Sequence, residues 1–541
     1  MTLFRIALKQ QRTGLIAMTL LCALGGVLNA LGFVQVAGTS QVERLAFARS
    51  MEVLGAQLSY MLPAPEHLET LAGYLQWRYF GSLVLILGIW GVISSTGSGR
   101  GDEERGLVEQ WLAAGASRTR YVATRVLVFI AVATFAIVAA MVVTYVAGVS
   151  AGEPLPLAGM ASLGIELLVT TLACFGIGLV VAQLVTTRRA AGFGAAGLVM
   201  ALFLINSAGR TSDVGPVRWL SPFYLYERSK PLTSDGALEF GSVAALTVAA
   251  LVLITLAVTA FVRRDLGGTA ITRASRTSRP SLDPSRDPLL RIPVVALLRQ
   301  QWLWLITWLV ALTALSAFLA SIIKTVIDTL TTSSTPVMRA YFERAGLAGY
   351  DSFVGAIWLS TLMLILSAYA IVQVQSWSAD DAEGRLATTL SAPVSRGRVI
   401  VERLIALLVA VGIICAAAGT AVYLVTTSQS IQIDGSKLAL ATALVVLIPL
   451  AFAAIGQLLA VWRPRSALVL LSTITVLSYF IVQFTPLFGW PEWVANVSLF
   501  SLYGMPMGGV VNWSGIAGLI GVTIAGTIGA LFAVQRRDVG A

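Results

Sequence analysis

Residues 104–125 read ERGLVEQWLAAGASRTRYVATR, and residues 382–403 read AEGRLATTLSAPVSRGRVIVER. The two stretches align without a gap, so that Arg125 matches Arg403. Each lies between two long apolar runs and is densely charged, although only 12% of the residues in the chain carry a charge. The repetition indicates a duplicated chain with a charged segment at the same point of both copies.

The composition is that of a membrane protein. Of 541 residues, 57% are hydrophobic, whereas soluble domains have roughly 45–50% apolar and about 25% charged residues. The apolar runs are continuous, which favours helices over the alternating strands of a barrel. Windows of about 20 apolar residues mark the membrane spans. Twelve spans are predicted, at 14–36, 77–97, 119–148, 157–186, 190–208, 239–262, 302–324, 353–376, 397–425, 438–461, 466–485 and 512–534.

Shorter matches recur in the same order along the chain. LAGY occurs at 71–74 and again at 347–350, and RRDLG at 263–267 is answered by RRDVG at 536–540. We therefore expect an all-α polytopic membrane protein whose twelve transmembrane helices form two parallel six-helix repeats, related by an axis along the membrane normal.

The predicted domains are a first six-helix half at 1–265, a cytoplasmic linker at 266–291 and a second half at 292–541. The linker is rich in Arg, Ser and Pro, which predicts a flexible tether. Most of the 37 Lys and Arg fall in segments that are cytoplasmic if the N-terminus is cytoplasmic, so the positive-inside rule places both termini in the cytoplasm. The net charge of +10 follows from this asymmetry, and no nucleic-acid partner is needed to explain it.

The charged segment at 102–115 has apolar residues at helical spacing and acids at its N-terminal end, where the helix dipole favours them. We expect a short amphipathic helix, with Ser117 and Ser395 capping the helices that follow each copy. A solvated loop anchored by Arg118 and Arg120 is the alternative. Such a loop needs charge but does not need the same amphipathic face in both halves, so a docking surface for a cytoplasmic partner is favoured.

Several kinds of chemistry are disfavoured by the sequence. The chain has no G-x-x-x-x-G-K-[ST] sequence, so ATP binding through a P-loop is not expected. His67 is the single histidine and lacks metal-ligand spacing, which argues against a histidine metal site and against Ser–His catalysis. We predict no metal and no catalytic residue. A membrane-embedded transferase or hydrolase would need a polar catalytic cluster, and we find none in the sequence.

Polar and aromatic residues inside the spans are candidates for a substrate pathway. Glu166 is the carboxylate placed well within a span, where an ionisable group is by default a functional hypothesis. A Glu that is merely protonated or hydrogen-bonded in the bundle is an equal alternative. Gln183 and Gln457 occupy matching positions and are expected to hydrogen-bond across the bundle. Trp90 and Trp358 either pack or line a cavity for an apolar ligand.

The chain resembles the permeases of ABC-2-type transporters, in particular the actinobacterial exporters of polyketide antibiotics of the tetronasin type. The resemblance is carried by EERGLVEQWLAAGASRTR at 103–120, DAEGRLATTLSAPVSRGR at 381–398, the paired RRD ends and the six-plus-six layout. It covers nearly the whole chain. The pattern E-x-G-R-L-x-x-x-L-x-x-P-V-S-R is common in such permeases, and the first half departs from it at 105–107, which leaves open whether the two halves couple equally.

The resemblance implies that residues 102–115 and 380–392 are coupling helices that dock into two separately encoded ATPase subunits. It also implies elbow helices at 2–12 and about 290–301. The residues expected to carry the coupling are Asp102, Glu103, Glu104, Gly106, Glu109, Trp111, Leu112, Asp381, Glu383, Gly384, Arg385 and Leu390. Re-entrant segments that close the outward exit are implied at SPFYLY and SLFSLY. Their candidate gate residues are Phe223, Tyr226, Phe500 and Tyr503.

The implied function is ATP-driven export of a lipophilic or amphipathic compound, such as an antibiotic or a lipid-like molecule, across a bacterial inner membrane. The chain itself would not be an enzyme, and ATP and Mg would bind in two copies of a partner ATPase. The alternative is a twelve-helix, proton-coupled secondary transporter of the major facilitator kind. The stretch SGRGDEER at 98–105 lacks the basic G-x-x-x-D-R-x-G-R-R type of signal expected there.

Overall fold

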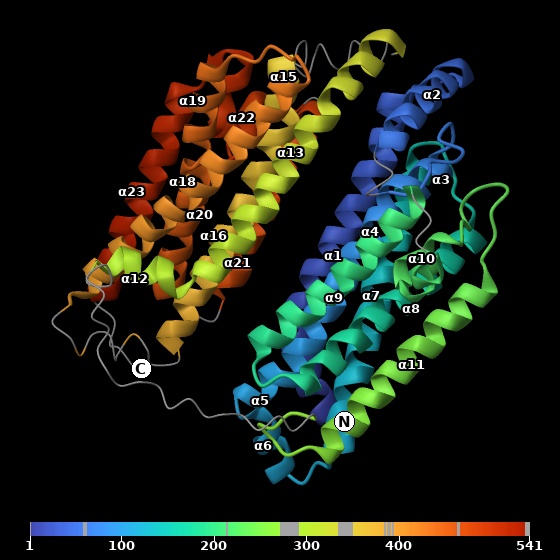
Figure 1. Ribbon diagram of the computed structural model, residues 1–541, viewed down its shortest axis with the longest axis vertical. Helices are drawn as coiled ribbons and strands as arrows, with labels where there is room; N and C mark the ends of the chain where they lie inside the picture. Colours follow the sequence, from blue (N-terminus) through green and yellow to red (C-terminus); the bar gives the residue numbers. More distant parts are fainter. Residues whose placement is uncertain are drawn as a thin grey trace. The chain divides into compact units, whose positions relative to one another are not determined.

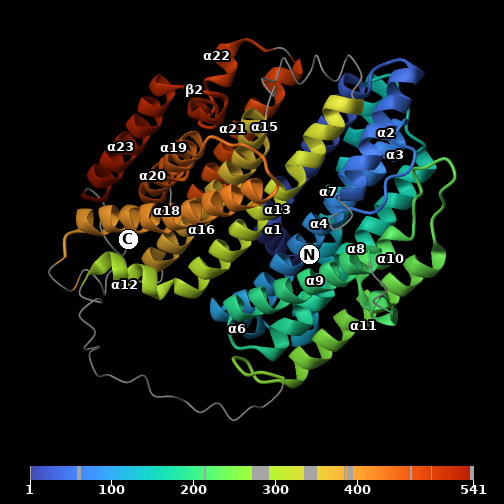
Figure 2. The same cartoon turned by 45° about the horizontal axis from the view of Figure 1, so that its top comes forward.

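The structure is a computed structural model. It describes residues 2–57, 62–211, 215–270, 292–333, 350–382, 386, 391, 394–462, 466–488 and 490–535. These residues form two compact units, the first from α1 to α11 and the second from α12 to α23, and each is described by itself (Figures 1 and 2).

The first unit is helical throughout its described residues. Its elements are α1 (Thr2–Ala37), α2 (Gln41–Gln57), α3 (Leu71–Tyr74), η1 (Leu75–Phe80), α4 (Gly81–Thr96), η2 (Gly97–Gly101), α5 (Asp102–Glu104), α6 (Leu107–Ala113), α7 (Arg118–Ser150), α8 (Leu157–Leu184), α9 (Arg188–Thr211), η3 (Gly215–Leu220), α10 (Pro222–Glu227) and α11 (Phe240–Arg263). Because η1, α4, η2 and α5 run on without a break, α3 and α5 mark the two opposite ends of one long helix (Figure 1).

The second unit adds one small hairpin to its helices. Its elements are α12 (Pro293–Gln300), α13 (Trp302–Ser333), α15 (Tyr350–Val354), η5 (Gly355–Leu359), α16 (Ser360–Ala382), α18 (Arg396–Ser428), α19 (Gly435–Val445), α20 (Leu447–Trp462), α21 (Ala467–Phe488), α22 (Glu492–Ala495), η6 (Ser501–Tyr503), β1 (Gly504–Met505), η7 (Pro506–Gly508), β2 (Val510–Val511) and α23 (Trp513–Gln535). The strands β1 and β2 pair antiparallel, with Gly504 opposite Val511.

The predicted spans all fall on helices. Among the described residues, eleven helices are long and apolar enough to cross a membrane. The predicted span at 466–485 falls on α21, whose apolar part, Ala467–Val482, is shorter. The polytopic helical fold is therefore confirmed, whereas the count of twelve, the repeat architecture and the orientation of the termini stay predictions. So do the predicted domain boundaries, because residues 271–291 lie outside the described ranges.

Helix α7 carries apolar residues on both its buried and its exposed face. Phe129 and Ala136 are fully buried, whereas Phe135 and Val142 are more than half exposed although they are just as apolar. A soluble helix would carry polar residues on the exposed side. An apolar outward face is expected where the surrounding solvent is lipid.

The same neighbours recur in both units, as the duplication predicts. Helix α8 packs against α4 and α11, and α20, at the corresponding place in the second unit, packs against α16 and α23. Each unit also has a π-helical turn, η1 or η5, just before its second long helix. Such turns are rare in proteins, so their appearance at matching positions supports the internal repeat.

The expectation of two elbow helices is wrong for the first copy. Residues 2–12 are the first three turns of α1, which continues unbroken to Ala37. In the second unit α12 is a separate helix that ends before α13, with Gln301 outside helical geometry between them. Pro293 at the start of α12 suits a first helical turn, because its missing N–H would have no partner there.

Small residues let α4 and α8 approach closely. A Cβ atom built on Gly91 would lie 2.9 Å from the carbonyl oxygen of Thr171 and 3.1 Å from the amide nitrogen of Phe175. One turn further along, a Cβ on Gly178 would lie 2.0 Å from the Ser95 hydroxyl. Because the obstacle at Gly91 is backbone, no side-chain rotation can relieve it.

Gly91→Ala should therefore destabilise the first unit by about 1–3 kcal/mol, the usual cost of overpacking. Gly197→Ala in α9 is the matched control, because nothing lies within 4 Å of the place that its new methyl group would occupy, and it should be neutral or stabilising. Thermal unfolding of the purified chain in one detergent compares the two variants. Equal melting temperatures would contradict the close α4–α8 contact.

Candidate functional site

The segment between α4 and α7 does not fold as the single short helix expected over 102–115. Residues Asp102–Glu104 (α5) end the long helix that begins at α3, and a separate short helix, α6, follows Gly106. Gly106 has a φ of +67°, in the left-handed region, and separates α5 from α6. The Ser117 hydroxyl then accepts a hydrogen bond from the Arg120 N–H at 3.2 Å and caps α7. In the second unit Ser395 caps α18 in the same way. Both predicted caps are confirmed.

Asp102 points into the unit and does not face solvent. It is 2% exposed. One carboxylate oxygen pairs with Arg125 and accepts a hydrogen bond from the Tyr121 hydroxyl at 2.9 Å, and the other accepts from Arg105 at 2.6 Å. Both oxygens of this buried carboxylate therefore have partners, and the bonds from the two arginines are charge-assisted.

Glu103 is held by a second buried set. Its two oxygens accept from the Arg264 guanidinium at 2.8 and 2.6 Å, and Arg100 pairs with it at 2.9 Å. The Gly267 N–H donates to it at 2.6 Å. Arg264 also donates to Gln183 at 2.8 Å. Asp102 and Glu103, two of the predicted coupling residues, thus neutralise buried arginines inside the unit, and their part in coupling stays a prediction.

The amphipathic character predicted for the segment is confirmed in α6. Val108 and Trp111 are buried, and the Trp111 ring lies 5.6 Å from the Tyr121 ring and under the Arg125 guanidinium. On the other side, the exposed face of α6 consists of Glu109, Gln110 and Ala113. Among the remaining coupling candidates, Leu112 is half-buried, and Glu104 is exposed and accepts a hydrogen bond from the Arg188 N–H.

The second copy of the segment lies largely outside the described residues. Asp381 is described and its carboxylate is 3.2 Å from Arg403, the counterpart of Arg125. The other predicted coupling residues of this copy, Glu383, Gly384, Arg385 and Leu390, lie outside the described ranges. Their placement stays a prediction.

Two family models match the chain and together span nearly all of it. The model described as ABC-2 family transporter protein matches residues 4–266, and the model described as Multidrug efflux system permease Rv1217c, C-terminal domain, matches residues 290–534. The chain is an ABC-2-type permease. It is thus a multi-pass protein of the bacterial inner membrane and the transport subunit of an ABC exporter, a kind of subunit that partners an ABC ATPase and is not itself an enzyme. No curated protein matches the chain.

Three pathway candidates of the permease have partners inside their own unit. Trp90 packs against Phe129, with ring centroids 5.3 Å apart, and Trp358 donates from Nε1 to the Ser316 hydroxyl at 2.8 Å. Gln457 donates to the Ile400 carbonyl at 3.4 Å, as expected of a bond across the bundle. Packing therefore accounts for these positions, and their role on a pathway stays a prediction.

Gln183 and Glu166 differ sharply in their surroundings. Gln183 belongs to the buried set around Arg264, at the end of the unit that carries α5. Glu166 is 0% exposed, and neither of its oxygens meets hydrogen-bond geometry with a described residue, although the Ser229 hydroxyl is near. A carboxyl group inside a span is costly to bury, and a protonated Glu166 beside Ser229 accounts for this position as well as a role on the pathway does.

The predicted gate segments lie between the fifth and sixth long helices of each unit. Phe223, Tyr226, Phe500 and Tyr503 are all buried. The Tyr226 hydroxyl donates to the carbonyl oxygen of Phe80, the last residue of the π-helical turn η1, at 3.2 Å, and the Tyr503 hydroxyl donates to that of Ala441 at 2.8 Å. Each segment is thus tied by a tyrosine to the backbone of a long helix.

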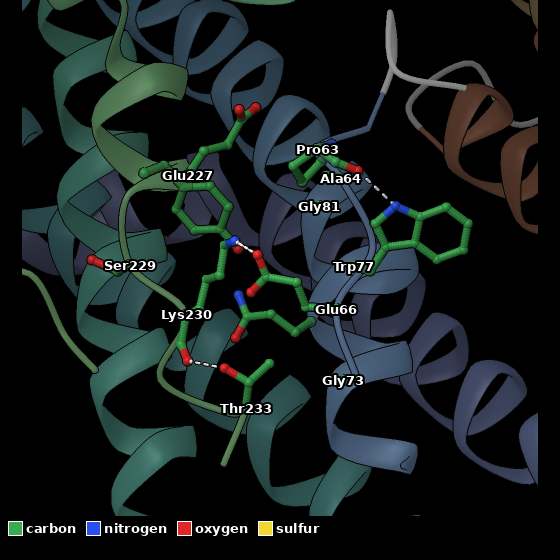
Figure 3. A pocket seen from close by; sticks show the side chains of 12 residues that line it. Pro63, Ala64, Glu66, Gly73, Trp77, Gly81, Glu227, Ser229, Lys230 and Thr233 are labelled. Carbon is green, nitrogen blue, oxygen red and sulfur yellow. Dashed lines mark hydrogen bonds and ion pairs between the residues drawn. The ribbon is translucent and has the colours of Figure 1, made fainter. Parts of the chain in front are cut away.

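A small cavity that the sequence did not predict lies beside α10 (Figure 3). It has a volume of about 30 Å³, enough for a water molecule. Lys230 pairs across it with Glu66, and Trp77 donates to the Pro63 carbonyl at 2.8 Å on its other wall. The segment before α3 and the loop after α10 are therefore joined by polar contacts.

His67 provides a second link between these two segments. Its Nδ1 is 3.2 Å from Glu69 and its Nε2 is 3.2 Å from Asp235. The hydrogen bond with Glu69 is the main reason that the pKa of His67 is raised, against a smaller opposing effect of burial, and the charge of Asp235 adds to it. Because the folded pKa is the higher one, this link is complete below the unfolded pKa and is lost as the pH rises through the folded pKa.

A titration of His67 should give a pKa above about 6.5, the usual value for histidine. Since it is the single histidine, one labelled imidazole signal in an NMR titration reports it directly. Glu69→Gln should lower the pKa more than Asp235→Asn does, because Glu69 makes the larger contribution. A pKa at or below the usual value, or no response to Glu69→Gln, would show that the link does not form.

Proposed function

We propose that the chain is the permease subunit of an ATP-driven exporter that moves a lipophilic or amphipathic compound out of the cytoplasm or the inner leaflet. ATP and Mg bind in separate ATPase subunits, which power the movement. The match to a multidrug efflux permease domain over residues 290–534 supports this class of substrate. The likeness to tetronasin-type exporters is part of the same proposal.

The observation that carries the proposal is the way α6 is anchored to the rest of the unit. Helix α6 lies at the end of the unit beyond the long helices (Figure 1), and its exposed residues are Glu109, Gln110 and Ala113. Beneath it, Trp111 rests on the Arg125 and Tyr121 side chains. A docking element must present an exposed surface and still transmit force, and a helix anchored on buried ion pairs meets both needs.

Two ATPase chains are proposed for each permease, because the charged segment occurs twice in one chain. This stoichiometry goes with two parallel six-helix repeats and with both termini in the cytoplasm. Glu166 remains a pathway candidate, since it is a fully buried carboxyl well within a span. The segments anchored by Tyr226 and Tyr503 are proposed to close the outward exit.

Reversing the charge at Glu109 and adding a large side chain at Ala113 should disrupt docking of the ATPase on α6. Glu109→Lys combined with Ala113→Arg should reduce ATPase retention on a tagged permease by about tenfold or more, the scale of losing an interface anchor. Glu52→Lys is the matched control, because Glu52 is an exposed acid of α2 at the opposite end of the unit, and it should leave retention unchanged.

Retention of the ATPase by the double variant would show that α6 is not the docking element. If the wild-type chain retains no ATPase, and its transport is abolished by a proton uncoupler, the secondary transporter becomes the better explanation. In the first outcome the wild-type chain retains the ATPase, and in the second it does not, so one series of purifications distinguishes the two.

A further inference from the structure

The buried contacts of Glu103 reach well beyond its own helix. Arg264 donates a hydrogen bond to each carboxylate oxygen of Glu103. It directly follows the last residue of α11, the sixth long helix of the unit. Glu103 is therefore bonded to the far end of the same repeat. Docking through the exposed face of α6 makes no use of this connection.

We propose that Glu103 and Arg264 form a transmission clamp, which makes the α5–α6 segment and the C-terminal end of α11 move as one body. On this proposal, which rests on the proposed function, a displacement of α6 by the ATPase passes directly to the sixth long helix. Glu103 and Arg264 are positioning residues, because neither lies on the exposed face of α6.

The clamp has several members that act together. Arg100 pairs with Glu103 and also donates from Nε to the Ala182 carbonyl at 2.9 Å, which adds the end of α8. Arg118, at the start of α7, donates to the Arg264 carbonyl at 2.7 Å. The side chains of Arg100, Glu103 and Arg264 are each at most 5% exposed, so water and salt compete little with their contacts.

The chain that follows α11 is held by the same clamp. The Gly267 N–H donates to Glu103, the Gly268 carbonyl accepts from Arg100, and the Ala270 N–H donates to the Gln183 carbonyl at 2.8 Å. Residues 266–270 are thus packed against the segment, although the composition predicted that a flexible tether starts at 266. A movement of the clamp consequently reaches the residues that follow α11, up to Ala270, through these bonds.

The second half has no arginine at the position that matches Arg100. The residue that aligns with Arg100 is Ser378, whose hydroxyl donates to the Val374 carbonyl of its own helix at 2.9 Å. The counterpart of Arg264, Arg537, lies outside the described residues. The contacts that Arg100 adds to the clamp are therefore not repeated at Ser378.

Hydrogen exchange at residues 264–270 tests the clamp in the permease–ATPase complex in nanodiscs, with and without a non-hydrolysable ATP analogue. In the wild-type complex the nucleotide should change exchange at these amides. Glu103→Gln should still retain the ATPase but lose the nucleotide-dependent change, and substrate-stimulated ATP hydrolysis should fall by about tenfold, a typical loss for a coupling residue.

Asp102→Asn is the matched control. It breaks a buried ion pair in the same helix, but Asp102 makes no hydrogen bond to Arg264 or to residues 265–270 and, in the described part of the chain, reaches α11 only through the stacking of Tyr121 on Phe261. The nucleotide-dependent change at 264–270 should therefore remain. Arg264→Lys is the second variant if Glu103→Gln does not fold. It keeps the charge but cannot make the two-point contact, and the change in exchange should fall by about threefold.

The clamp is overturned if nucleotide leaves exchange at 264–270 unaltered in an assembled wild-type complex, or if Glu103→Gln keeps both the exchange response and stimulated hydrolysis. It is also overturned if Asp102→Asn abolishes the response as fully as Glu103→Gln, because the effect would then be general loosening. Failure of the wild-type chain to retain the ATPase contradicts the proposed function and removes the clamp with it.

Discussion

The pairing of two buried carboxylates with arginines at one end of the first unit is the constraint on which the site depends. Asp102 meets Arg125 and Glu103 meets Arg100 and Arg264, so the ends of α4, α7 and α11 are fixed to one another. Removing one member would leave an uncompensated buried charge, at a cost of about 3–5 kcal/mol. The short helix α6 can project from the unit because its base is held in this way.

On the proposed function, the same contacts let an almost wholly apolar bundle transmit a mechanical signal. Along most of their length the helices of the first unit meet through small apolar surfaces, as at Gly91 and Gly178. Such surfaces resist closer approach but oppose sliding only weakly. Charge-assisted bonds occur at both ends of the unit, and those around Glu103 lie where a partner would push. There the Arg264 guanidinium links Glu103 to the end of the sixth long helix.

Much of the helical fold follows from local pattern. Continuous apolar runs predict the long helices. A serine just before a helical run predicts an N-cap, and Ser117 and Ser395 both accept a hydrogen bond from the N–H of the residue three positions later. The inward placement of Trp111 follows from helical spacing. The direction of Asp102 and Glu103 does not, because their partners lie far along the chain, and Glu103 meets Arg264 across 161 positions. Acids at a helix start are equally well explained by the helix dipole.

Two further features could not be predicted from the sequence. Apolar periodicity does not distinguish the π-helical turns η1 and η5 from ordinary helix. The paired RRD ends were visible as a repeat, but only the fold brings Arg264 to Glu103. A repeated basic residue at the end of each half, opposite a repeated acidic segment, was the available signal for the clamp.

The central claim is that α6 of this permease contacts an ATPase through its exposed face while the acids beneath it are engaged internally. Photo-crosslinking from single positions in the assembled complex tests it most directly, with a photoreactive amino acid at position 109 or at position 52. The account predicts a crosslink to the ATPase from position 109 and none from position 52. No crosslink from position 109, in a complex that still hydrolyses ATP in response to substrate, would contradict it.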